Sequence, residues 1–158
     1  MPEPLLLPAV QDDAPEVLVL QRCCWVTEAI INDTLAIPAL HEELADVRAW
    51  IASAWVLRDD GRLIGGVRAA LEGDTWRIGR LMVAPDRRGE GLGSRLLAHV
   101  EAAAPAEAVR LALFTGAGSE RNLGMYERAG YRRTSTDGVV VHLEKPRLRG
   151  AGSGADLH

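Results

Sequence analysis

Residues 87–97 combine the groups that proteins use to bind an anion. Three glycines alternate with other residues in this stretch: Gly89, Gly91 and Gly93. They follow an apolar run at 81–84 and lead into a helical pattern from Ser94. A helix start leaves backbone N–H groups unpaired and carries positive dipole character, and glycines let a phosphate approach closely. The pattern predicts a site for a phosphorylated ligand, to which Arg87 and Arg88 add charge. A tight strand-to-helix connection without a ligand is the alternative.

Glu28 is the carboxylate best suited to grip or deprotonate an amine. Asp12 and Asp13 are candidate caps for a helix that begins near Pro15 and runs to about Ile31. One face of this helix carries residues at spacings of four and three: Val17, Gln21, Cys24, Glu28 and Ile31. A carboxylate on a mainly apolar face costs desolvation unless it has a partner, and an amine would be one. A boundary position that faces solvent is the alternative.

A second informative stretch, residues 119–131, places a tyrosine on the buried side of a helix. Ser119 suits the helix N-cap, and Gly130 stands where a glycine would end the helix. Apolar residues recur every three positions around Tyr126, so this side chain is predicted to face the core. From the spacing alone, Tyr126 is a core aromatic residue whose hydroxyl finds a partner.

Short strands position these residues. Apolar runs between turn residues predict strands at 5–10, 54–58, 63–71, 76–83, 109–114, 132–134 and 139–143. Pro38 keeps its segment irregular, and a further helix is predicted over 41–52, where His41 fits a solvated surface histidine. Three meandering strands followed by a strand, a loop and a helix predict an antiparallel start that continues into a parallel pair.

Neither common phosphate-binding motif fits the glycine loop. Its G-x-G-x-G spacing differs from the dinucleotide fingerprint, and the only lysine of the chain, Lys145, excludes a P-loop. Residues 88–93 instead read Arg-x-x-Gly-x-Gly, and residues 122–131 read Asn-x-x-x-Tyr-x-x-x-Gly-Tyr. With the apolar strand before the loop, these motifs resemble the two signatures of the GNAT family of N-acetyltransferases, and the resemblance spans roughly residues 5–145.

The resemblance implies an α/β (α+β) fold with a mixed sheet of six to seven strands and about four helices. The N-terminal part of that sheet is antiparallel, and its central pair of strands is parallel and splayed. Here the pair would be the strand that ends at Val83 and the strand at 109–114. The thioester arm of coenzyme A would lie between them.

The resemblance also implies a function, acetyl-CoA-dependent transfer of an acetyl group to a primary amine by direct attack in a ternary complex. Backbone groups of Met82 and Val83 are expected to hold the pantetheine arm, with the Val83 N–H near the thioester oxygen. Backbone amides of the loop are expected to hold the pyrophosphate: Arg88, Gly89, Gly91, Gly93 and Ser94. Asn122 is expected to touch the arm, and Tyr126 is expected to protonate the leaving thiolate.

The general base is not fixed by the motifs, because the strand at 76–83 lacks a glutamate that is frequent in the family. An alkyl ammonium with a pKa near ~10.4 must lose a proton before it attacks a thioester, and one carboxylate suffices for that. Glu28 is the first choice and Glu72 the second. The competing interpretation is a non-catalytic acyl-CoA-binding regulatory module that has lost its acceptor site.

Length and composition indicate a single domain over residues 1–147 and a disordered tail at 148–158. The sequence contains neither an apolar run long enough to span a membrane nor a signal-peptide pattern. Adjacent Cys23 and Cys24 suit neither a usual disulfide nor a zinc site, so we expect a cytoplasmic protein without a metal. Dimers are common in the resembled family, so the expected partners are an amine substrate and a second copy of the chain.

The net charge of −4 is divided unevenly along the chain. Residues 1–47 carry a net charge of −8, and residues 48–158 carry +4. The basic part suits a phosphorylated cofactor, and the acidic part suits a cationic amine. The alternative is that both parts are solvent-exposed surfaces that bind no charged ligand. Nucleic acid is not expected as a partner, because no stripe of basic and aromatic residues is present.

Overall fold

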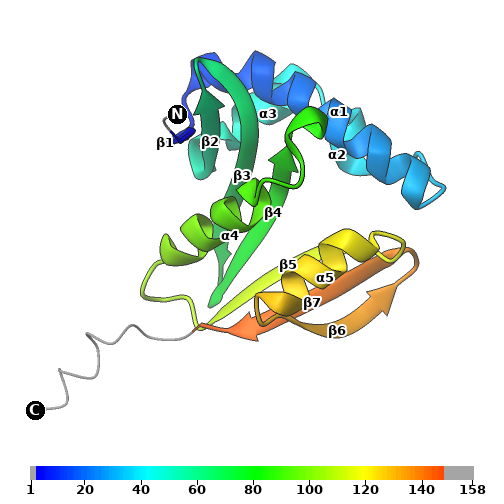
Figure 1. The fold of residues 1–158 in the computed structure, drawn as a ribbon. Helices are drawn as coiled ribbons and strands as arrows, with labels where there is room; N and C mark the ends of the chain where they lie inside the picture. Colours follow the sequence, from blue (N-terminus) through cyan, green and yellow to red (C-terminus); the bar gives the residue numbers. More distant parts are fainter. Residues whose placement is uncertain (1–2, 148–158) are drawn as a thin grey trace, which may run out of the picture.

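The computed structural model describes residues 3–147, and in this part of the chain seven strands form one sheet in the order β1-β2-β3-β4-β5-β7-β6 (Figure 1). The strands are β1 (Leu5–Pro8), β2 (Ala54–Asp59), β3 (Arg62–Glu72), β4 (Thr75–Val83), β5 (Arg110–Gly116), β6 (Arg132–Asp137) and β7 (Val140–Pro146). The α-helices are α1 (Ala14–Ile31), α2 (Pro38–His41), α3 (Leu44–Trp50), α4 (Leu92–Ala102) and α5 (Glu120–Arg128).

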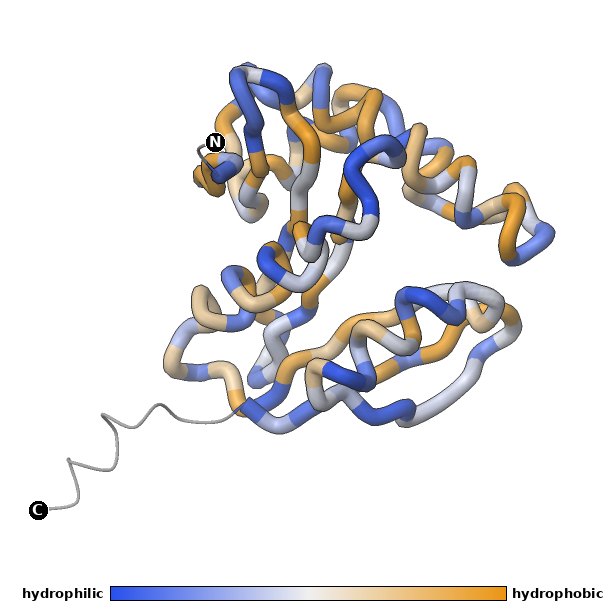
Figure 2. Tube along the Cα trace, in the orientation of Figure 1, coloured by the Kyte–Doolittle hydropathy of each residue, from blue (hydrophilic) through white to orange (hydrophobic). Residues whose placement is uncertain are grey.

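The helices cover the sheet from both sides. In Figure 1, α4 and α5 lie in front of the sheet, and α3 lies behind it. Trp76 of β4 donates its indole N–H to the Val100 carbonyl of α4 at 2.9 Å, which marks one face. Arg68 of β3 lies 5.1 Å over the Trp50 ring of α3, which marks the other face. Figure 2 shows apolar residues concentrated on the central strands between these layers, while β6 is hydrophilic.

Strands β4 and β5 are the parallel pair, and they separate soon after they meet. Only three rows pair them: Thr75 with Arg110, Trp76 with Leu111 and Arg77 with Ala112. Beyond these rows β4 stays on β3 and β5 stays on β7, so the two strands diverge. A bulge in β4 accompanies the divergence, and there Arg80 adopts a left-handed backbone conformation with φ of 51°. The predicted mixed sheet with a splayed parallel pair is confirmed.

Two predicted helix boundaries were wrong. Pro38 does not keep its segment irregular but begins the short helix α2, because its fixed φ suits the first helical turn. The helix predicted over 41–52 is divided: α2 ends at His41, and α3 starts at Leu44. Glu43 precedes α3, and its N–H donates to the Asp46 carboxylate at 2.8 Å. The helices therefore number five in the described residues, one more than expected.

Asp13 and Ser119 stand at the N-cap positions of α1 and α5, as predicted, but neither side chain makes a capping hydrogen bond, because other partners engage them. The Asp13 carboxylate accepts the Val10 N–H at 2.8 Å and pairs with Arg58 at 2.7 Å. The Ser119 hydroxyl donates to Glu28 at 2.7 Å rather than accepting from the start of α5. Ile31 is 48% exposed, so the buried face of α1 ends before it.

The tail expected at 148–158 lies outside the described residues. Among the residues from 3 to 147, none of the helices combines the length and the apolar character that a membrane crossing requires.

Candidate active site

The glycine loop leads into α4 and leaves its first N–H groups without helical partners. Gly91 precedes the helix with φ of 78°, and no side chain caps it. The first hydrogen bond of α4 runs from the Arg95 N–H to the Gly91 carbonyl at 3.1 Å. The backbone N–H groups of Leu92, Gly93 and Ser94 therefore have no acceptor within the helix. This arrangement suits an anion at the start of α4.

Gly89 and Gly91 keep the loop open. Gly89 has φ of 82°, a conformation that side chains disfavour, and an added Cβ at either glycine would meet nothing within 4 Å. Gly93 has a different role, since an added Cβ there would lie 3.4 Å from Met125 Sδ and 3.8 Å from Val83 Cγ2. It lets α4 approach β4 and α5. The glycine turn is therefore not filled by packed side chains.

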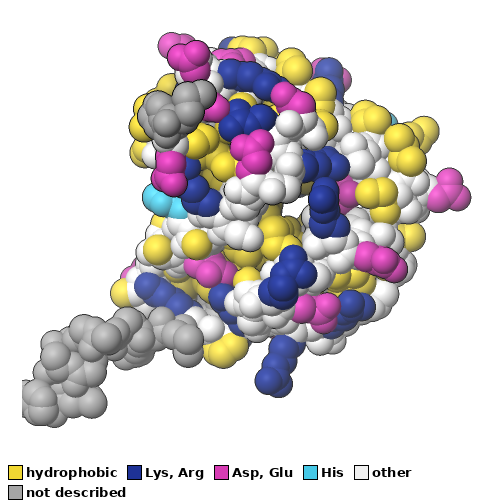
Figure 3. All heavy atoms as spheres, viewed as in Figure 1, with side chains coloured by type: hydrophobic (Ala, Val, Ile, Leu, Met, Phe, Trp, Pro, Cys, Tyr) yellow, Lys and Arg dark blue, Asp and Glu magenta, His cyan; other side chains and the backbone are white. Residues whose placement is uncertain are grey.

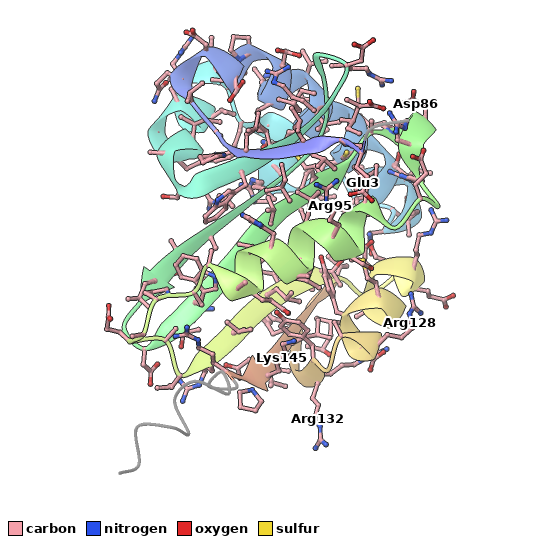
Figure 4. All side chains as sticks on the ribbon, turned by 60° about the vertical axis from the view of Figure 1, so that its left-hand side comes forward. Glu3, Asp86, Arg95, Arg128, Arg132 and Lys145 are labelled. Atoms are coloured by element: carbon pink, nitrogen blue, oxygen red, sulfur yellow. The ribbon has the colours of Figure 1, made fainter. Side chains whose placement is uncertain are left out.

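Arg87 does not add free charge to the loop as predicted. Its guanidinium pairs with Asp59 at 2.7 Å and with Glu90 at 2.9 Å, and it holds the pKa of Glu90 below its ordinary value. Asp86 pairs with Arg62 at 2.7 Å, which lowers the pKa of Asp86 to about 2. These pairs fix the loop to β2 and β3, and Figure 4 shows Asp86 on the turn between β4 and α4. Arg88 is exposed and remains available for an anion.

The end of β4 turns polar backbone groups toward the space between β4 and β5. The Ala84 N–H donates to the Ile64 carbonyl of β3 at 2.8 Å. The Val83 carbonyl belongs to the same trans peptide and points the opposite way, toward β5. There it accepts the Cys24 thiol at 3.3 Å, a contact that spacing did not predict. Burial raises the pKa of Cys24 to about 11, so the thiol stays protonated at neutral pH.

Two buried tyrosines lie together on the other side of this space. The rings of Tyr126 and Tyr131 meet edge to face, with centroids 6.1 Å apart. The Tyr131 hydroxyl donates to Glu101 at 2.7 Å, whereas no group of residues 3–147 hydrogen-bonds the Tyr126 hydroxyl. Burial raises the pKa of Tyr126, and the nearby Glu28 carboxylate raises it further. Tyr126 therefore keeps its proton, and its hydroxyl is free to donate it.

Glu28 lies with Asn122 and Tyr126, as the sequence analysis required of a single site. Its Oε1 accepts the Asn122 amide at 2.9 Å in addition to the Ser119 hydroxyl. The end of α1 is fixed beside it, because Asn32 accepts the Gly118 N–H at 2.8 Å. Asn32 and Ser119 thus support the site, although no motif pointed to them.

Glu72, the second choice for a base, is not brought to this site. It lies at the hairpin between β3 and β4 and pairs with Arg77 at 3.1 Å. The whole of β4 separates this hairpin from Val83, at the end of the strand.

A second polar cluster, beneath α1–α3, escaped sequence reasoning. Glu42 Oε1 accepts three donors: Gln21 Nε2 at 2.8 Å, Trp50 Nε1 at 3.3 Å and Arg80 Nε at 3.3 Å. Arg68 lies on the same face, opposite Gly79 in the strand register. In the sequence, only the polar Gln21 on the apolar face of α1 indicated such a cluster. The other residues of the cluster come from separate elements, so their proximity could not be predicted.

The face that carries Arg68 continues into a hollow of about 310 Å³ beside β5. Its walls come from four strands, β4 to β7: Arg77, Ile78, Ala112, Leu113, Phe114, Thr134, Ser135, His142, Leu143 and Glu144. On the opposite face, Figure 3 shows a depression between the two halves of the molecule, with Lys and Arg side chains along its rim. Among residues 3–147, the His, Cys, Asp and Glu side chains form no cluster of three or more that could hold a metal ion.

Comparison with known proteins agrees with this geometry. A family model described as the acetyltransferase (GNAT) family matches residues 16–131. The UPF0157 protein YqkA of Bacillus subtilis (strain 168) is 28% identical over 127 residues, which are 78% of this chain and 36% of that protein. The chain thus spans about a third of the length of this curated relative.

Solved structures show the same fold at low sequence identity. N-acetylglutamate synthase from Neisseria gonorrhoeae, complexed with coenzyme A and N-acetyl-glutamate, superposes with a TM-score of 0.75 at 22% identity. The match covers 94% of this chain and 36% of that one. PaiA N-acetyltransferase from Thermoplasma acidophilum, in complex with coenzyme A, gives a TM-score of 0.77 at 14% identity, over 92% and 99% of the two chains.

Proposed function

This chain belongs to the acetyltransferase (GNAT) family, and from that premise we propose that it transfers an acetyl group from acetyl-CoA to a primary amine by direct attack in a ternary complex. One observation carries the proposal: a buried tyrosine whose hydroxyl has no partner among residues 3–147 lies with a carboxylate where the central strands diverge. Two similar proteins support the coenzyme, since they were crystallised with coenzyme A. We also infer that residues 1–147 act as one domain, because their buried side chains form one core.

The loop and the open end of β4 fit acetyl-CoA. We assign its pyrophosphate to the free N–H groups at the start of α4 and in the loop, and its pantetheine arm to the backbone of Met82 and Val83. The residues assigned to the coenzyme are Met82, Val83, Arg88, Gly89, Gly91, Gly93, Ser94 and Asn122. When bound, acetyl-CoA supplies a thioester carbonyl that an amine can attack and a thiolate that can leave.

Two side chains then handle the protons. Glu28 accepts the proton that the ammonium must lose, directly or through a water. Tyr126 donates its hydroxyl proton to the leaving thiolate, and its raised pKa ensures that the proton is present. The Val83 N–H points into the same space and can bind the oxygen on which charge develops.

A thiol-release assay tests this proposal. Purified protein is mixed with acetyl-CoA and a panel of primary amines, and free CoA is measured, with amine-free reactions as the control for hydrolysis. Binding of acetyl-CoA is measured separately by calorimetry. We expect binding, and CoA release that depends on an amine. Binding without release for every amine would favour the regulatory module, and absence of binding would overturn both interpretations.

A further inference from the structure

We propose that the acceptor amine carries a carboxylate, which Arg68 and Arg80 bind beneath α1–α3. The proposal rests on the proposed function and names the class of its acceptor, an amino acid or a similar short amino-carboxylate. It departs from the cationic acceptor that the charge division suggested.

Arg68 is a half-buried cation without an anion. Its guanidinium stacks 5.1 Å over Trp50, and no group of residues 3–147 hydrogen-bonds it. Burial lowers the pKa of Arg68, and repulsion from Arg80 lowers it further. A half-buried guanidinium with free donors is costly unless a partner arrives, and a carboxylate matches its planar fork.

Arg80 is the second cation of the cluster, and its side chain is fixed by its neighbours. Its guanidinium pairs with Glu42 at 3.2 Å and lies 5.9 Å from the centre of the Trp25 ring, and its side chain is only 14% exposed. Glu42 is the only carboxylate hydrogen-bonded in this cluster of the described residues, so two guanidinium groups share one negative charge. Arg68, Arg80 and Glu42 together therefore carry one unbalanced positive charge. It lies on the face of the sheet that leads into the hollow beside β5.

Gln21 belongs to the same cluster and helps to hold Glu42 in place. Its side chain is fully buried, and its amide nitrogen donates to Glu42 and to the Ala39 carbonyl. Its amide oxygen is buried and has no hydrogen-bond partner. An orphaned buried acceptor is rare, and an ordered water would satisfy it, whereas a carboxylate ligand has no hydrogen to donate.

Helix α1 connects this cluster to the proposed reaction site. Trp25, which packs against Arg80, and Glu28 are three residues apart on α1 and therefore adjacent on its surface. One turn of helix rises about 5.4 Å, the scale of a single amino acid. An acceptor with its carboxylate at Arg68 and Arg80 would thus direct its amine toward Glu28 and Tyr126.

Arginines pair with four of the nine acidic residues before position 48. Asp13 and Glu16 both pair with Arg58, and Glu43 pairs with Arg22. These pairs offset part of the negative charge of residues 1–47. Glu28, by contrast, accepts only neutral donors and remains available for one ammonium group.

Matched substrates test the proposal. CoA release is compared for arginine and agmatine, phenylalanine and phenethylamine, and lysine and cadaverine, pairs that differ by one carboxylate. Within the pair that the enzyme uses best, we expect kcat/KM to be roughly tenfold to a hundredfold higher for the amino acid than for the decarboxylated amine. This is the effect expected of one charge-assisted hydrogen bond. Arg68→Gln should raise KM for the acid and leave its decarboxylated partner and acetyl-CoA binding unchanged. Arg68→Lys should keep part of the preference.

Arg110→Gln is the matched control, because Arg110 is exposed and pairs with Asp74 away from the cluster. Equal rates for acids and amines, or equal losses for both in Arg68→Gln, would overturn the inference and leave acetyl transfer standing. If acetyl-CoA binds but no amine releases CoA, the proposed function fails instead. Calorimetry of the amino acids with the CoA-bound protein then tests the carboxylate site on its own. If the amino acids bind, Arg68→Gln must abolish that binding. If they do not bind, the carboxylate site is contradicted.

Discussion

At the scale of the residue, two neighbouring tyrosines differ in one respect that matters. Tyr131 gives its hydroxyl proton to a hydrogen bond with Glu101, while Tyr126 keeps an uncommitted hydroxyl beside Glu28. The spacing of the sequence predicted that Tyr126 is buried, and this is confirmed. The alternative, in which its hydroxyl finds a partner in the core, does not hold for the described residues, and that difference supports a chemical role.

Tyr126→Phe is expected to lower kcat for CoA release about a hundredfold, because the thiolate loses its proton donor. The dissociation constant of acetyl-CoA should change little, since the ring remains. Tyr131→Phe removes an equivalent hydroxyl and should reduce stability by about 1–3 kcal/mol through the lost bond to Glu101 while leaving kcat nearly intact. An unchanged kcat in Tyr126→Phe, measured by stopped-flow or steady-state thiol release, would remove the role of this residue.

Cys24 should make stability sensitive to alkaline pH. Its pKa is raised from 9.0 to about 11 in the folded state, so folding favours the protonated thiol. The contribution is complete below pH 9 and is lost as the pH rises through 11. At about pH 10.5 the loss in the free energy of unfolding approaches about 2 kcal/mol, because each pKa unit corresponds to 1.36 kcal/mol. Urea unfolding from pH 8 to 10.5 should show a shallower decline for Cys24→Ala, and parallel curves would contradict this.

At the scale of the element, the start of α4 is defined by backbone conformation. The alternating glycines predicted an open loop before a helix, and the left-handed φ of Gly89 and Gly91 confirms it. The fate of Arg87 could not be predicted, because Asp59 lies 28 residues away in the chain and meets it only in the folded sheet. The Arg80–Glu42 pair spans 38 residues and was hidden for the same reason.

Gly91→Ala should weaken acetyl-CoA binding severalfold, because an alanine resists φ of 78° and the loop would shift its N–H groups. Gly138→Ala provides the control. Gly138 has φ of 61° and equally open surroundings, but it lies in the turn between β6 and β7. Both variants should lose about 1 kcal/mol of stability. Equal acetyl-CoA affinities by calorimetry would argue against the loop as the binding site.

At the scale of the whole molecule, two halves meet along the three rows that pair β4 with β5. Their divergence follows from the family fold, which the motifs allowed us to predict. The bridges from α1 to α5 and the segment before it, through Glu28 and Asn32, could not be predicted because they join residues 86 to 94 positions apart. The fold was therefore more readable from sequence than the side chains that complete the site.

Acetyl-CoA should join the two halves. At a concentration of 100 times its dissociation constant, a ligand stabilises the folded state by about 2.7 kcal/mol, which corresponds to roughly 5–10 °C in Tm. Hydrogen exchange should slow in peptides that cover 78–83 and 113–116, where the strands have no partner on their inner edges. Peptides from β1 and β2 serve as the control and should change less, by no more than the gain in global stability explains. Protection confined to that control region would place the coenzyme elsewhere.

The outer strands of the sheet carry a consequence for self-association. At one border, β1 is four residues long and ends at Pro8, which has no N–H to offer a new neighbour. At the other, β6 is exposed throughout and carries Arg132, Arg133 and Asp137. Neither border invites an added strand, so the sheet resists growth into ribbons and fibrils. Two copies that associate would have to meet through their faces or helices.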